Sequence, residues 1–584
     1  MQHASSSPAR RYGVLHYLLL GSLLYALAVL SMSVFNLHSP GYLPSARLHT
    51  IVDSVKNGLN HARRASDQIR EDEHALNVHV LPTGGTVERR LKCIAWRATA
   101  NCRPDGPRIP ERDRPCTKTV PSGQPGYCEL QDEDSGELFR VARRTCDEAV
   151  GKAALFRCLE APRFANFHVL THKVMQRALT PGFALPNMME GPSELQDGIV
   201  MVIYPKIVAS AYASIRVLRE VLGCRLPIEI WFRPDEMRKV TASIDPLRQL
   251  AVNDTIEFRE IDDPLAIEFA TKVFAIYHSA FDRVLFLDSD NVPVQDPTFL
   301  FQSHEFMKTG AVFWPDFWQP SHTLFHLHQD SMLWELLQIP FVDMFEQESG
   351  QVLVNRRRHA ASLEIVNFFT FHRPNPFMQL KLVWGDKDLF RLAWLKLQAP
   401  FHMIKTPPAV AGKVINGLFC GMTMVQHDTQ GNELFLHRNS HKLTGGAILN
   451  PADKKFKSSR GTHGRVEDSQ HAETKRAKPI ESEDYPDPAI WTHIMSFRTS
   501  SPRSEYEIET YHADPEFSKD QICYGRRRLG TSTHFYVQDI AGTDFFRLET
   551  YLRRFAMEAG QLHQATVDAI AAEQFHRRPF RQQD

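Results

Sequence analysis

Residues 282–301 read DRVLFLDSDNVPVQDPTFLF, and this stretch decides the fold class that the sequence indicates. The apolar run at 284–287 predicts a short buried strand, which ends at the polar residues that follow. Alternate residues of an extended segment point the same way, so the side chains of Asp288 and Asp290 can converge. Two carboxylates at the carboxyl end of a buried strand suit Mn²⁺ or Mg²⁺ bound together with a phosphate. The alternative is a loop with two solvated acids, because D-x-D is a short and common pattern.

The residues before this stretch alternate between strand-like and helix-like patterns. Strand-like runs lie at 199–204, 227–232 and 255–258, and helical spacing lies at 209–222 and 265–281. This alternation is typical of an α/β domain with a parallel or mixed sheet. No G-x-G-x-x-G or Walker sequence accompanies it. A metal held by Asp288 and Asp290 is therefore the candidate holder of a phosphate.

The N-terminal region contains an apolar run at residues 13–37 without Asp, Glu, Lys or Arg. A run of this length can cross a bilayer as a helix. Arg10 and Arg11 flank its N-terminal side, so residues 1–12 are predicted to stay in the cytosol and the rest of the chain to be lumenal. We expect an uncleaved type II signal anchor followed by a stem at 38–91. The alternative is a cleaved signal peptide.

Six of the nine cysteines fall in a segment rich in Pro, Gly and Arg, predicted as a cysteine-rich module at 92–160. They are Cys93, Cys102, Cys116, Cys128, Cys146 and Cys158. In a lumenal chain they predict disulfides, with 15 possible pairings. Zinc is the rival, but no C-x-x-C pair is present. A stiff spacer is the expected role, and carbohydrate or protein binding is the alternative. Cys224, Cys420 and Cys523 are scattered and can be free or paired.

The remaining composition limits the other possibilities. Lys and Arg total 68, as do Asp and Glu, so the charge balance gives no case for a nucleic-acid partner. We expect the α/β domain to occupy residues 161–584. Within it, residues 453–488 are dense in charge and poor in large apolar side chains, which predicts a disordered insertion.

Six motifs occur in order between residues 198 and 443. They are LPIEI (226–230), Lys272 followed by the stretch at 282–297, GAVFWPDFW (310–318), ESGQVLV (348–354), GDKDLF (385–390) and FLHRNSHK (435–442). In this order they resemble the fungal-type Golgi α-mannosyltransferases of glycosyltransferase family 71, in the GT-A superfamily. The resemblance covers less than half of the chain and leaves out both the cysteine-rich module and the charged insertion.

The resemblance implies a GT-A-like fold with a Rossmann-like mixed sheet, GDP-mannose as donor, a divalent metal, and transfer with retention to a glycan. Asp288 and Asp290 would hold Mn²⁺ (or Mg²⁺) against the donor diphosphate. His437 matches the position of a third metal ligand, and the alternative is a capped surface histidine. Lys272 and Lys442 are candidates to pair with phosphate oxygens.

Two further motifs are candidates to bind the sugar. Trp314 offers an aromatic face and Asp316 a carboxylate for hydroxyl groups, and the alternative is a core strand followed by a turn. Gly350 would permit close approach of the backbone to the sugar, and Gln351 lies beside it. These residues complete the predicted donor site.

A strong general base is not expected, because the leaving phosphate of retaining GT-A enzymes is thought to accept the acceptor's proton. Glu348 and Asp386 are the carboxylates to suspect as a nucleophile, with Asp316 as a third site carboxylate. Asp386 could instead be a helix N-cap.

The sequence therefore predicts a single-pass type II Golgi membrane α-mannosyltransferase of protein glycosylation. A related retaining enzyme that uses a UDP-sugar, and a catalytically silent lumenal lectin or scaffold, are the alternatives.

Overall fold

The computed structural model describes residues 56–58, 60, 77–147, 151, 154–188, 195–252, 254–446, 485–513, 522–530 and 532–576. The chain forms two units, Met1–Asn77 and Val78–Asp584, and the second contains all the sheets described below. No helix of the described ranges is long and apolar enough to cross a membrane. The anchor predicted at 13–37 lies outside those ranges, as does the charged insertion up to residue 484.

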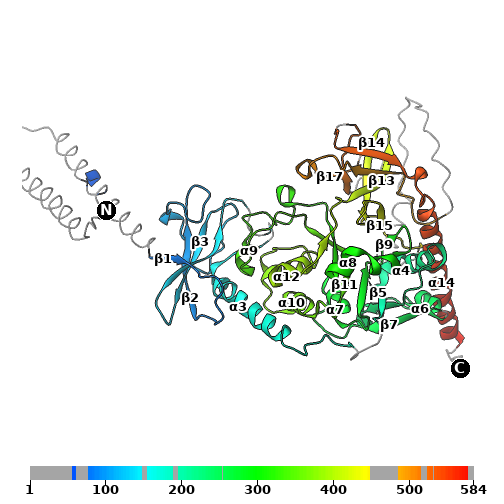
Figure 1. Ribbon diagram of the computed structural model, residues 1–584, viewed down its shortest axis with the longest axis horizontal. Helices are drawn as coiled ribbons and strands as arrows, with labels where there is room; N and C mark the ends of the chain where they lie inside the picture. Colours follow the sequence, from blue (N-terminus) through cyan, green and yellow to red (C-terminus); the bar gives the residue numbers. More distant parts are fainter. Residues whose placement is uncertain are drawn as a thin grey trace, which may run out of the picture. The chain divides into compact units, whose positions relative to one another are not determined.

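The cysteine-rich module is a four-stranded sheet, drawn in blue to cyan in Figure 1. Its strands, in spatial order, are β1 (Val78–Val80), β4 (Leu138–Arg144), β3 (Gly126–Asp132) and β2 (Leu91–Ala98). The disulfides are Cys93–Cys116, Cys102–Cys146 and Cys128–Cys158. The prediction that these six cysteines form disulfides is confirmed, and β1 comes from the range expected to be stem.

This module packs against two helices that come later in the chain. Trp96 and Cys128 share one hydrophobic core with residues of α3 (Ala161–Ala178) and α9 (Met332–Leu337). The carboxylate of Glu335 accepts hydrogen bonds from the backbone N–H groups of Ala142 and Arg143, at 2.8 and 3.0 Å. The module therefore contributes side chains to the core of its neighbour, and its role as a spacer stays a prediction.

A seven-stranded mixed sheet forms the centre of the second unit (Figure 1). Its strands, in spatial order, are β12 (His402–Met403), β10 (Ala311–Pro315), β11 (Gln347–Asn355), β8 (Arg283–Leu287), β5 (Asp197–Ile203), β6 (Ile228–Phe232) and β7 (Ile256–Glu260). The strands β8, β5, β6 and β7 are parallel, whereas β11 is antiparallel to both β8 and β10. The predicted α/β class with a mixed sheet is confirmed.

Helices cover both faces of this sheet. Alternate residues of a strand point to opposite faces, so each strand contributes apolar side chains to the cores on both sides. Ile199 and Met201 of β5 enter a core with α4 (Val208–Arg216) and α14 (Leu548–His576). Val200 enters a second core with α7 (Ala270–His278), α10 (Ala360–Phe371) and α12 (Leu389–Leu397). Shorter helices are α5 (Pro234–Met237), α6 (Asp245–Ala251), α8 (His304–Thr309) and α11 (Pro376–Gln379). In Figure 1 the red helix α14 runs beside α4, which it contacts.

A second large sheet follows the central one. It contains β17 (Glu509–His512), β18 (Ile522–Gly525), β14 (Leu418–His427), β13 (Ala409–Ile415), β16 (His493–Phe497) and β19 (Phe535–Asp539), with β15 (Glu433–His437) between β14 and β9 (Asn291–Pro293). A fourth disulfide, Cys420–Cys523, joins β14 to β18, and Cys224 is a buried free thiol. Since β9 directly follows the D-S-D turn, this sheet reaches the end of β8.

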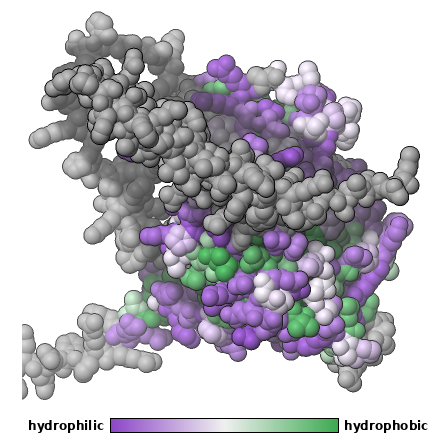
Figure 2. All heavy atoms as spheres, turned by 90° about the vertical axis from the view of Figure 1, so that its left-hand side faces the viewer, coloured by the Kyte–Doolittle hydropathy of each residue, from purple (hydrophilic) through white to green (hydrophobic). Residues whose placement is uncertain are grey.

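Residues 485–488, the last residues of the predicted insertion, are ordered and contact the segment that follows β15. Asp487 is buried, and its carboxylate accepts hydrogen bonds from the backbone N–H groups of Thr444 and Gly445. On the face shown in Figure 2, most of the described surface is hydrophilic, with hydrophobic residues in smaller patches between polar ones.

Candidate active site

The register of three strands brings distant polar residues to one edge of the central sheet. Asp288 follows β8, and Gln351 of the antiparallel β11 pairs with Leu287. The backbone N–H of Asp288 therefore donates to the carbonyl oxygen of Gly350 at 2.8 Å. On the other side, His437 at the end of β15 pairs with Asn291. The carboxyl end of β8 thus meets the start of β11 and the end of β15.

Asp288, Asp290 and His437 form a cluster suited to a metal ion. One ligand atom from each lies within 4.8 Å of the others. The Nε2 atom of His437 is 3.5 Å from Oδ1 of Asp290 and 3.9 Å from Oδ2 of Asp288. Two carboxylates and one imidazole fit Mn²⁺, and a set of three leaves positions for phosphate oxygens.

The charges around His437 favour a cation at this place. Burial would lower the pKa of His437, but hydrogen bonding to Asp290 and Glu348 and their charges raise this pKa to about 10. Burial would likewise raise the pKa of Asp290, whereas His437 and Lys442 hold it well below its ordinary value. Lys442 is also paired with the Asp290 carboxylate. A bound metal would compete with these positive charges for the same carboxylates.

Lys272 is placed behind Asp288. Its Nζ lies 3.3 Å from Oδ2 of Asp288, 3.6 Å from Oδ2 of Asp386 and 2.8 Å from the carbonyl oxygen of Ser349. Burial opposes its charge, but Asp288, Asp386 and Glu348 outweigh this and raise the pKa of Lys272 above its ordinary value. With its ammonium group occupied by protein oxygens, Lys272 positions Asp288 and Asp386, whereas Lys442, whose side chain is 42% exposed, remains accessible.

Asp386 is buried near Lys272 and is not the N-cap of α12. The residue preceding α12 is Asp388, whose Oδ1 accepts from the backbone N–H of Gln347 at 3.0 Å. Burial raises the pKa of Asp386 to about 6, against the opposing charge of Lys272. Its Oδ2 is buried, makes no hydrogen bond among the described residues, and lies 3.6 Å from Nζ of Lys272. Asp386 is therefore held in place by the charge of Lys272.

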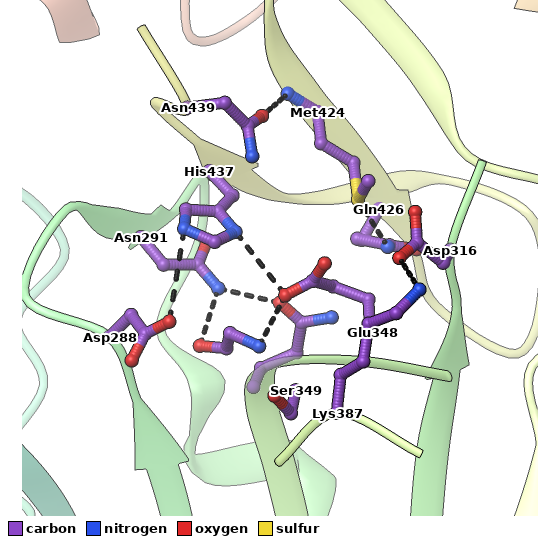
Figure 3. Close-up of polar contacts among 12 residues, drawn as sticks. Asp288, Asn291, Asp316, Glu348, Ser349, Lys387, Met424, Gln426, His437 and Asn439 are labelled. Carbon is purple, nitrogen blue, oxygen red and sulfur yellow. Dashed lines mark hydrogen bonds and ion pairs between the residues drawn. The ribbon is translucent and has the colours of Figure 1, made fainter. Parts of the chain in front are cut away.

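Glu348 lies against His437, as Figure 3 shows, and Gly350 lies close to both side chains. Oε1 of Glu348 accepts from the backbone N–H of Gly350 at 2.6 Å and lies 3.6 Å from Nδ1 of His437. Burial would raise the pKa of Glu348, but His437 foremost lowers it to about 2, so Glu348 is ionised. Gln351 is fully buried and its Oε1 accepts from Asn291 at 2.6 Å, which places it behind the D-S-D turn.

A second buried charge cluster lies on the other side of Glu348 (Figure 3) and includes residues that sequence reasoning missed. Nζ of Lys387 lies 2.6 Å from Oδ2 of Asp316 and 2.8 Å from Oε2 of Glu346. Burial raises the pKa of Asp316 to about 7, although Lys387 opposes this. The sequence signal for Lys387 was its position between two aspartates in the motif GDKD (385–388). No sequence signal pointed to Glu346.

Trp314 is not part of the site. It is fully buried, its Nε1–H donates to the carbonyl oxygen of His427 at 2.9 Å, and its ring meets that of Phe435 edge-on at 5.4 Å. Phe317 and Trp318 are also buried. The prediction of a sugar platform at Trp314 was wrong, and the core-strand alternative is correct, because β10 is buried on both faces.

Tyr204 is a further missed residue. It directly follows β5 at the carboxyl edge and is 38% exposed. Burial foremost raises its pKa, while charges of Lys442, Asp290 and Asp288 also act on its hydroxyl. The only sequence signal for it was its place at the end of a strand-like run, at 199–204.

Residues 196–428 match the protein family described as "Mannosyltransferase putative". This segment resembles a mannosyltransferase family. The resemblance predicted from the sequence is confirmed by curated relatives of the same kind. Alpha-1,2-mannosyltransferase MNN2 of Saccharomyces cerevisiae is 26% identical over 272 residues, which cover 40% of this chain and 45% of the relative. Alpha-1,2-mannosyltransferase MNN23 of Candida albicans is 24% identical, covering 38% and 44%. The chain thus spans less than half the length of these mannosyltransferases.

Solved glycosyltransferase structures are also similar to part of this chain. The mannosyltransferase Ktr4p from S. cerevisiae in complex with GDP has a TM-score of 0.26 at 11% identity, covering 44% of this chain and 82% of Ktr4p. The galactosyltransferase LgtC with donor and acceptor sugar analogues has a TM-score of 0.25 at 17% identity, covering 36% of this chain and 73% of LgtC.

Proposed function

We propose that this protein is a metal-dependent α-mannosyltransferase that transfers mannose from GDP-mannose to a glycan with retention. The observation that carries the proposal is the cluster of Asp288, Asp290 and His437 at the carboxyl edge of a mixed α/β sheet. Asp288 and Asp290 lie within the segment that matches a mannosyltransferase family. A GT-A-like fold is part of the proposal.

The donor diphosphate would bind beside this cluster. Mn²⁺ held there would neutralise charge that develops on the leaving diphosphate. Lys272 keeps the Asp288 carboxylate in place. The partly exposed Lys442 offers a point charge to a phosphate oxygen. Tyr204, exposed at the same edge, is placed to contact the nucleotide.

The carboxylates differ in protonation, which suits them to different tasks. Glu348 is ionised, and its orientation is fixed by the N–H of Gly350, so it can stabilise positive charge at the anomeric carbon. Asp386 and Asp316 have raised pKa values and can hold sugar hydroxyls. In retaining transfer, the bond from the acceptor oxygen to the anomeric carbon forms as the bond to the diphosphate breaks. The acceptor's proton goes to a phosphate oxygen.

The proposed location is the lumenal side of the Golgi membrane, with a single-pass type II topology. Four disulfides support a secretory-pathway compartment, because disulfides persist in oxidising compartments and are rare in the cytosol. The predicted anchor at 13–37 belongs to the same proposal.

The experiment measures the melting temperature of the full chain in detergent with GDP or UDP, each with and without Mn²⁺. We expect a rise with GDP that requires Mn²⁺, since a ligand at about 100 times its Kd stabilises by about 2.7 kcal/mol. The variant Asp288→Asn/Asp290→Asn should lose the rise. The matched control Asp235→Asn/Glu257→Gln removes two carboxylates that are 53% and 67% exposed and should keep it.

Transfer from GDP-mannose to an α-linked mannose disaccharide is then followed by product analysis. A Mn²⁺-dependent rise with UDP alone would contradict the GDP-mannose proposal and favour the UDP-sugar alternative. Absence of any nucleotide-dependent rise, together with absent transfer, would contradict enzymatic function and favour a lectin or scaffold.

A further inference from the structure

We propose that the exposed ring of Trp384, with Phe325 stacked against it, is the platform on which a mannose ring of the acceptor glycan packs. This inference rests on the proposed function and names its acceptor subsite. The ligand chemistry is the apolar C–H face of a pyranose, which packs on aromatic rings.

Trp384 is unusually exposed for its size. It is 59% exposed, although large aromatic side chains are mostly buried in folded proteins. Its ring stacks on Phe325 with centroids 5.3 Å apart and an interplanar angle of 29°. Nζ of Lys387 lies 4.2 Å from the centroid of the Phe325 ring. Phe325 therefore packs against the Trp384 ring and is itself held by the ammonium group of Lys387. The exposed part of the Trp384 ring stays open to a ligand.

The loop at residues 384–388 connects this exposed ring to the buried carboxylates. Gly385 has a φ of +62°, and a Cβ there would meet the ring of Phe269 at 2.8 Å, so the loop is packed tightly at that point. The next two residues enter the site, where Asp386 lies 3.6 Å from Lys272 and Lys387 lies 2.6 Å from Asp316. A ligand on Trp384 would thus lie two residues along the chain from Asp386.

The arrangement favours the acceptor over the donor as occupant. Asp288 and His437 lie on one side of Glu348, and Asp316 and Lys387 lie on the other (Figure 3). The charge of the donor diphosphate would hold it on the side of the candidate metal ligands. The Trp384 loop joins the site through Lys387, on the opposite side of Glu348, so the acceptor ring packs away from the diphosphate while its reacting hydroxyl reaches back to the phosphate oxygen that takes its proton.

The test compares Trp384→Ala and Trp384→Phe in the full chain with the wild type. We expect Trp384→Ala to raise the KM for an α-linked mannose disaccharide about tenfold, the equivalent of about 1.4 kcal/mol of aromatic packing. The KM for GDP-mannose and the Mn²⁺-dependent rise in melting temperature with GDP should stay unchanged. Trp384→Phe should restore most of the acceptor affinity. The matched control Phe546→Ala removes another exposed ring, 48% exposed, and should change neither KM.

Binding of the disaccharide is also measured by isothermal titration, which needs no turnover. Trp384-dependent binding without any transfer from GDP-mannose would support the platform while contradicting the proposed function. A raised KM for GDP-mannose with an unchanged KM for the disaccharide would overturn the inference and assign the ring to the donor. Wild-type and Trp384→Ala proteins that bind the disaccharide equally well would overturn it as well.

Discussion

At the scale of single residues, Gly350 occupies a position that no larger residue fits. A Cβ at this position would lie 2.6 Å from Nδ1 and 2.7 Å from Cε1 of His437, and 3.0 Å from Oε1 of Glu348. All three atoms belong to side chains of the candidate active site. The space around Gly350 therefore controls where the imidazole and the carboxylate lie.

We predict that Gly350→Ala lowers transferase activity by about 100-fold, because displacement of reacting groups by about 1 Å has effects of this size. The measurement is kcat/KM for GDP-mannose together with the melting temperature. Gly542→Ala is the matched control, since a Cβ at Gly542 meets nothing within 4 Å. Wild-type kcat/KM in Gly350→Ala would contradict the assignment of His437 and Glu348 to the site.

His359 makes the stability of the fold depend on pH. It is buried, and its Nε2 contacts the carbonyl oxygen of Thr309 at 2.8 Å. Burial foremost lowers the pKa of His359 to about 4, so the folded state keeps it neutral. The unfolded chain takes up this proton below pH 6.5 and the folded chain only below about 4. This group's contribution is therefore present above pH 6.5 and is lost as the pH falls from 6.5 towards 4.

We predict that His359→Gln flattens the fall in unfolding free energy between pH 6.5 and 4 by at most about 3 kcal/mol. Urea unfolding at several pH values measures it. His304→Gln serves as control, since the His304 side chain is 80% exposed. An equal slope in the wild type and His359→Gln would show that another group causes the pH dependence.

At the scale of secondary-structure elements, the sequence predicted what depends on local pattern. The strands β5, β6 and β8 are short apolar runs with all or most residues buried, so they were visible within one or two residues. In β7 only Ile256 is buried, yet this strand was also predicted within two residues. The sequence did not show which strands pair on either side of the Asp288-Ser289-Asp290 turn. The pairing of β11 with β8 and of β15 with β9 depends on packing between segments roughly 60 to 150 residues apart, and no local pattern encodes that.

The same distinction explains the errors in the predicted site. Trp314 was given a ligand role because its residue type suits sugars, but its position in β10 turns it into the core. Trp384 was overlooked because exposure cannot be read from an isolated tryptophan. Lys272 was identified as a cation near the site, yet its buried contact with Asp288 and Ser349 required the fold.

The disulfide Cys420–Cys523 links β14 to β18 across 103 residues of sequence. We predict that Cys420→Ser/Cys523→Ser lowers the unfolding free energy by about 2–4 kcal/mol, because the cross-link restricts the unfolded chain. Differential scanning calorimetry under oxidising conditions measures this. Cys224→Ser controls for the loss of a buried thiol without a cross-link. Equal destabilisation by Cys224→Ser would mean that packing, and not the cross-link, causes the effect.

At the scale of the whole molecule, the cysteine-rich module and the central sheet are one folding unit. Residues Val78–Asp584 form this unit, and the first strand, β1, lies parallel to β4. Nε of Arg140 also donates to the carbonyl oxygen of Val78 at 3.0 Å. Removing β1 would expose the edge of β4 and leave these hydrogen bonds unmade.

We predict that a fragment comprising residues 78–584 keeps the melting temperature of the full chain, whereas residues 92–584 melt several degrees lower. The comparison by calorimetry uses the same buffer for both fragments. Identical melting temperatures for the two fragments would show that β1 contributes nothing to the unit.

The candidate site takes its side chains from positions spread between Tyr204 and Lys442, on both large sheets. No single helix, hairpin or subdomain contains enough of them to bind a nucleotide sugar. A partly folded chain would therefore have no catalytic activity, rather than reduced activity. During heating or denaturant titration, catalysis should vanish in the same cooperative step as tertiary structure. Turnover therefore reports that the long-range contacts among these site segments have formed.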